Sequence, residues 1–119
     1  MKEDNIIQDK SFAFAIRIVH LYKYLCDEKK EFVMSKQILR CGTSVGTNIE
    51  EAIGGQSDKD FLAKLTVSYK EAREICFWLR LLKATNYLTE EQADSLLNDI
   101  KEILKIIGKI QITMKKTNS

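Results

Sequence analysis

The chain has 119 residues, of which 45% are hydrophobic, and this length suits one domain with a single packed core. Charged residues make up 30% of the chain and the formal net charge is +2, which excludes a strongly basic nucleic-acid-binding arm but allows a local basic patch. The three cysteines (Cys26, Cys41 and Cys76) are far apart and odd in number, and His20 is the sole histidine, so neither a disulfide framework nor a zinc site is predicted.

The first predicted helix spans about residues 9–27, with Asp9 or Ser11 as its N-cap. Its apolar residues cover an arc of roughly 220°, whereas the helix of an ordinary globular protein buries a stripe nearer 100° wide. Large exposed apolar patches mark interaction sites, so we expect the surplus face to form an oligomer interface. The alternative is that these residues pack beneath the following loop or are scattered surface residues. The face consists of Phe14, Ile18, Leu21 and Leu25.

The second predicted helix spans about residues 36–53, with Ser35 as its N-cap and a Gly-Gly pair beyond its end. The third spans about residues 58–85 and is capped by Ser57. A capping box of Thr89 and Gln92 opens the fourth, which spans about residues 90–115. Short loops join antiparallel neighbours, so the sequence predicts an all-α, up-down-up-down four-helix bundle occupying the whole chain as one domain.

Helix 36–53 carries polar and small residues that are mediocre helix formers, which indicates a specific role for them. Gly42 and Gly46 lie beside its apolar stripe and would let another helix backbone approach closely. One neighbouring face forms a polar strip bordering the core, which could fix helix register or a subunit seam, or could contact a ligand or nucleic acid. The strip consists of Arg40, Ser44, Asn48 and Glu51.

This stretch resembles the signature of the bacterial 23S rRNA intervening-sequence protein family, which has Ser, Ile or Val, two residues, then Asn-Ile-x-Glu-Gly. Ala52 stands where glycine is common in that pattern. The resemblance continues through Phe61 and Glu74 and covers about residues 12–112. The matching residues here are Arg40, Ser44, Val45, Asn48, Ile49 and Glu51.

The resemblance implies a cyclic homo-oligomer, expected to be a pentamer, with no enzyme activity. It also implies similarity to the accessory variability proteins of diversity-generating retroelements. Those proteins form a barrel whose basic surface binds nucleic acid and a reverse transcriptase, so RNA, DNA and a reverse transcriptase are the partners that the resemblance suggests.

Helix 90–115 carries a basic stripe of Lys101, Lys105 and Lys109, with Lys116 nearby, which could follow a phosphate backbone. No aromatic residue interleaves with the stripe, so base stacking there is not indicated. The alternative is a solvated face, because acidic and polar residues are mixed in, namely Asp94, Asn98 and Glu102. A second basic group surrounds the first loop, where a solvated surface is again the alternative. It consists of Lys29, Lys30, Lys36 and Arg40.

Catalysis finds little support in the sequence. His20 has no evident base, nucleophile or metal partner, and the Glu-x-x-His motif of di-metal bundles is absent. No catalytic, cofactor-binding or metal-binding residue is predicted. The N-terminal segment lacks a signal-peptide core and no apolar run reaches the ~20 residues that span a bilayer, so we expect a cytoplasmic protein.

The sequence therefore predicts a non-enzymatic, homo-oligomeric helical bundle that binds nucleic acid or a nucleic-acid-processing partner through a basic surface. The alternative is a protein–protein interaction scaffold that binds no nucleic acid.

Overall fold

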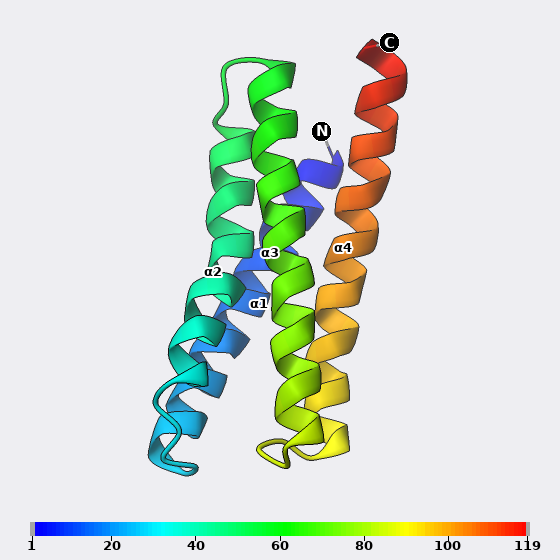
Figure 1. Ribbon diagram of the computed structural model, residues 1–119. Helices are drawn as coiled ribbons and strands as arrows, with labels where there is room; N and C mark the ends of the chain where they lie inside the picture. Colours follow the sequence, from blue (N-terminus) through cyan, green and yellow to red (C-terminus); the bar gives the residue numbers. More distant parts are fainter. Residues whose placement is uncertain (1, 119) are drawn as a thin grey trace.

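The computed structural model describes residues 2–118, with side chains described for residues 5–116. Four helices follow one another along the chain, and each runs antiparallel to the one before it (Figure 1). The predicted all-α, up-down-up-down four-helix bundle is confirmed; the described residues contain no strand. The bundle measures 48 × 22 × 19 Å, and the first helix packs against the last less extensively than consecutive helices pack against each other. The helices are α1 (Lys2–Asp27), α2 (Met34–Ile53), α3 (Asp58–Ala84) and α4 (Glu90–Asn118).

Helix α1 begins earlier than predicted. It starts at Lys2 rather than near residue 9, so Asp9 and Ser11 lie inside the helix and cap nothing. Ser11 is buried, and its hydroxyl donates a hydrogen bond to the carbonyl oxygen of Gln8, at 3.1 Å. The additional turns are stabilised because Ile7 packs into the core with only 1% of its surface exposed.

The predicted oligomer interface on α1 is wrong. Its four residues, Phe14, Ile18, Leu21 and Leu25, lie in the core of the single chain with at most 6% of their surface exposed. The apolar arc of α1 is so wide that its periodicity does not say which part faces the other helices. The solvent-facing part of the arc is instead Phe12, Ile16 and Val19, which are 65%, 46% and 36% exposed.

Close packing of α1 against α2 explains why residue 42 of α2 is a glycine. A Cβ atom added at Gly42 would lie 2.8 Å from both Cγ1 and Cγ2 of Ile18, which is itself fully buried. At Gly46 the same atom would lie 3.4 Å from the carbonyl oxygen of Ser11. Gly108 of α4 is different, because a Cβ atom there would meet no neighbouring side chain or other helix within 4 Å.

Two of these interior glycines, Gly42 and Gly108, should respond in opposite ways to alanine. Gly42→Ala gains the better helix propensity, worth ~1 kcal/mol, but overpacks Ile18, which typically costs about 1–3 kcal/mol. We expect a net loss of roughly 1 kcal/mol in the free energy of unfolding. Gly108→Ala should gain up to about 1 kcal/mol. Urea denaturation of both variants measures this, and a stabilised Gly42→Ala would contradict the close packing.

The start of α2 is held by Glu31 rather than by the predicted Ser35. The helix begins at Met34, its N-cap residue Val33 makes no side-chain cap, and Ser35 lies inside the first turn. The Glu31 carboxylate accepts hydrogen bonds from the backbone N–H groups of Val33, Met34 and Ser35 at 3.2, 3.1 and 2.8 Å. Burial raises the pKa of Glu31, but these donors outweigh burial, so its pKa lies below the ordinary 4.5.

The Glu31 cap makes the free energy of unfolding depend on pH. Because the folded-state pKa is lowered, the cap stabilises the protein above pH 4.5 and is lost as the pH falls through the folded-state value. Glu31→Gln should therefore lose about 1–2 kcal/mol at pH 7 and have a shallower loss of stability below pH ~4.5. Urea unfolding from pH 7 to pH 3 checks this. Glu28→Gln, in the exposed part of the same loop, should behave like the wild type.

The two remaining predicted caps are confirmed. The Ser57 hydroxyl accepts a hydrogen bond from the backbone N–H of Asp60 at 3.1 Å, at the start of α3. At the start of α4, Thr89 and Gln92 form the reciprocal bonds of a capping box, at 3.1 and 2.9 Å.

Candidate nucleic-acid interface

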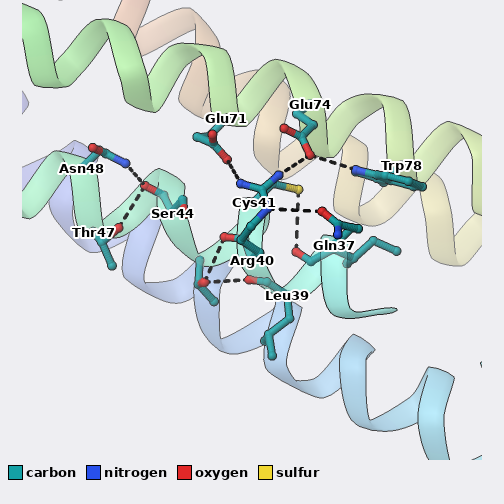
Figure 2. Close-up of polar contacts among 12 residues, drawn as sticks. Gln37, Leu39, Arg40, Cys41, Ser44, Thr47, Asn48, Glu71, Glu74 and Trp78 are labelled. Carbon is teal, nitrogen blue, oxygen red and sulfur yellow. Dashed lines mark hydrogen bonds and ion pairs between the residues drawn. The ribbon is translucent and has the colours of Figure 1, made fainter. Parts of the chain in front are cut away.

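The polar strip of α2 faces α3 within one chain, where Arg40 is the centre of a hydrogen-bonded network (Figure 2). Its guanidinium pairs with the carboxylates of Glu71 and Glu74, at 3.0 and 2.5 Å. The indole N–H of Trp78 donates to the same Glu74 oxygen at 3.1 Å. Burial raises the pKa of Glu74, but the bonds from Trp78 and Arg40 lower it more, so the carboxylate stays charged.

The other three residues of the strip also form contacts within the chain. Asn48 donates from its side-chain amide to the carbonyl oxygen of Ser44 at 2.8 Å, along α2 itself (Figure 2). Glu51 forms an ion pair of 3.1 Å with Lys64 of α3. Arg40 and Glu51 therefore bridge α2 to α3, while Ser44 and Asn48 bond along one helix.

The basic stripe of α4 lines a groove beside α3. Lys101, Lys105 and Lys109 are all exposed and lie on its wall. The groove has a volume of about 560 Å³, and α3 contributes Tyr69 to it. No aromatic residue interleaves with the lysines along α4, as predicted, but the neighbouring helix α3 brings one beside them. Lys116 is exposed farther along α4 and is not part of the groove lining.

Helix α3 adds two cations that sequence reasoning missed, Arg73 and Arg80, both exposed. Burial raises the pKa of the Cys76 thiol, while the positive charges of Lys101, Arg73 and Arg80 oppose that rise. Arg73, Cys76 and Arg80 share one face of α3, and Lys101 belongs to the neighbouring helix α4. The signal in the sequence was the spacing of residues 73, 76 and 80 along one helix face, but only the pairing of α3 with α4 brings that face beside the lysines.

The acidic residues of α4 do not neutralise the stripe. Asp94 pairs with Lys83 at 2.9 Å, and Glu102 turns toward α1, where it pairs with Lys10. Within the described residues, none of the three α4 lysines lining the groove makes an ion pair. The acidic residues that the sequence places among the α4 lysines, Asp94 and Glu102, therefore pair with lysines of α3 and α1 instead.

Comparison with known proteins places the chain in a family. A family model described as the 23S rRNA-intervening sequence protein matches residues 3–109. The chain belongs to this family. Its structure is similar, with a TM-score of 0.90 and 55% identity, to a crystal structure from Bacteroides thetaiotaomicron VPI-5482 described as a protein of unknown function from the S23 ribosomal protein family. That match covers 92% of this chain and 97% of the other, and no curated protein matches the sequence.

The second predicted basic group, around the loop between α1 and α2, is dispersed in the structure. Arg40 is engaged by α3 carboxylates, and Lys29 lies over the ring of Tyr24 with its ammonium 5.9 Å from the ring centroid. Lys30 and Lys36 are exposed. This group therefore presents separate charges around a loop rather than along a groove.

His20 is exposed on α1 and borders an open groove of about 450 Å³ between α1 and α4. In the described part of the chain its ring makes no hydrogen bond or ion pair, whereas a catalytic histidine needs an oriented partner. Across the same residues, no group of three His, Cys, Asp or Glu side chains could hold a metal ion. Nor is any of the described helices long and apolar enough to cross a bilayer.

Proposed function

We propose that this chain is a non-enzymatic protein that binds nucleic acid through the α3–α4 basic face, defined as Arg73, Arg80, Lys101, Lys105 and Lys109. The observation that carries the proposal is that three lysines of α4 line one groove while Arg73 and Arg80 are exposed on the neighbouring helix α3. Among the described residues, none of the five has an ion-pair partner. Unpaired cations raise the local positive potential even though the net charge of the chain is only +2.

The spacing of the lysines suits a phosphate backbone. Residues four apart on an α-helix are separated by ~6 Å along its axis, so the three lysines form a row about 12 Å long. Each cation that neutralises a phosphate releases condensed counterions, which makes binding sensitive to salt. Phosphate contacts position a protein on nucleic acid but carry no base information, so we expect little sequence preference.

We also propose that the protein self-associates, with a pentamer expected from the family resemblance. The support is the exposed apolar stripe on α1, in which Phe12, Ile16 and Val19 share one face. A ring of subunits would present one basic face from each copy and so multiply the phosphate contacts.

Charging this stripe should separate the subunits without unfolding them. Phe12 is 65% exposed in the single chain, so Phe12→Glu should leave the helical circular-dichroism spectrum unchanged. The buried glutamate would oppose association strongly, and we expect the mass from light scattering to fall to that of one chain. Phe12→Leu serves as the control and should retain the wild-type mass. If Phe12→Glu also keeps that mass, the subunits do not meet through this stripe.

The proposed function is tested by fluorescence anisotropy with labelled RNA and DNA across a salt series. If all five cations contact phosphates on duplex DNA, the slope of log K against log salt concentration should approach about −4.5 per subunit. Absence of binding at low salt would exclude the proposal. The exposed α1 stripe would then favour the second candidate, an interaction scaffold whose partner is another protein.

A further inference from the structure

We propose that the groove between α3 and α4 accepts the bases of single-stranded nucleic acid, with one base stacked on Tyr69. This inference rests on the proposed function and names the substrate class for it. The groove contains lysines that can bind phosphates. It also contains an aromatic ring and apolar side chains, which suit bases rather than phosphates. The apolar lining is Tyr69, Leu104, Gly108 and Ile112.

Tyr69 is the part of the groove that can recognise a base. Tyr69 is half-buried and packs against the core, and it also lines the groove, so its side chain is restrained where a base could reach it. Stacking on an aromatic ring tolerates every base, because every base has a π-face. The exposed apolar side chain of Ile112, 60% accessible, borders the same groove.

Gly108 supplies an independent argument, because packing does not explain it. A side chain there would meet no neighbouring side chain or other helix within 4 Å, and glycine is unfavourable in a helix interior. Because Gly108 has no side chain, it leaves space in the groove beside Lys105 and Lys109. A larger residue at 108 should therefore fill the groove without altering any charge or disturbing the core.

Single strands are favoured over duplexes by this arrangement. The bases of a duplex are already stacked and paired, whereas an unpaired strand can turn a base out onto an aromatic side chain. The lysines along α4 would hold the phosphates on either side of that base. A duplex could use only the lysines and arginines.

The test compares a fluorescein-labelled 20-nucleotide oligo-uridine with an RNA duplex of 20 base pairs by anisotropy, using the full chain. Wild type should bind the single strand about tenfold more tightly than the duplex. Tyr69→Leu keeps apolar packing but loses the ring, and Gly108→Leu fills the groove. Each should weaken single-strand binding about tenfold and leave duplex binding and the salt slope unchanged. Tyr69→Phe and Gly108→Ala, the matched controls, should bind like the wild type.

The two proposals fail in different ways. If Tyr69→Leu and Gly108→Leu bind the single strand as wild type does, or lose duplex affinity equally, base stacking in the groove is overturned while electrostatic binding stands. If the wild type binds neither probe at low salt, both proposals fail. Thermal melting of each variant shows that the protein assayed is folded.

Discussion

Phe14→Ala is expected to lower the free energy of unfolding by about 3–5 kcal/mol, while Phe12→Ala changes it by no more than about 0.5 kcal/mol in the single chain. The two phenylalanines are two residues apart on α1, yet Phe14 is 1% exposed and Phe12 is 65% exposed. Truncating Phe14 removes a buried ring and leaves a cavity in the core, and a packed core relaxes only partly around such a space.

Urea denaturation followed by circular dichroism measures both variants. Association couples stability to protein concentration, so each midpoint should be recorded at two concentrations. Phe14→Ala should lower the midpoint at both concentrations, whereas any loss in Phe12→Ala should be confined to the higher one. Equal destabilisation by the two substitutions at low concentration would mean that the buried face of α1 has been assigned incorrectly.

Replacing Lys101, Lys105 and Lys109 together by glutamine is expected to weaken nucleic-acid binding roughly a hundredfold at low salt, taking ~1 kcal/mol for each ion pair at the protein surface. The slope of log K against log salt concentration should become shallower by about 3, one unit for each phosphate that no longer has a lysine beside it. All three side chains are exposed, so the fold should be unaffected.

A matched control separates the position of the charges from their number. Lys29, Lys30 and Lys36 are also exposed and lie around the first loop, away from the groove. Changing these three to glutamine removes the same positive charge. If the control triple weakens binding as much as the α4 triple, binding follows overall charge and the α3–α4 basic face has no special role.

The fold could be predicted from the sequence because each helix carries a local signal. Ser57 and the Thr89–Gln92 capping box mark two helix starts that the structure confirms. The start of α2 was missed because its cap, Glu31, acts from three residues before the helix, with a carboxylate reaching three backbone N–H groups. Such a reach depends on the path of the loop, which no local preference specifies.

The buried face of α1 was missed for another reason. A helix that is apolar over most of its circumference fits its neighbours in several rotations, and the choice is made by tertiary packing. Here Ile18 fits against Gly42, whose lack of a side chain admits it. The pairing of a large residue with a glycine on another helix is visible only in three dimensions.

The candidate site was predictable only in its part on α4. The repeat of Lys101, Lys105 and Lys109 is local and could be read from the sequence. Arg73, Arg80 and Tyr69 lie 21 to 40 residues before the lysines in the sequence and come beside α4 because α3 packs against it. The acidic residues Asp94 and Glu102 of α4 could also be read from the sequence. Their ion pairs with Lys83 and Lys10 could not, because these depend on how the helices pack.

Binding through the α3–α4 basic face is tested most directly by a footprint of lysine reactivity, using acetylation and mass spectrometry with and without single-stranded RNA at low salt. Binding through the α3–α4 basic face predicts protection of Lys101, Lys105 and Lys109, with unchanged labelling of Lys29, Lys30 and Lys36. Protection of the loop lysines with continued labelling of the α4 lysines would show that nucleic acid binds elsewhere on the protein.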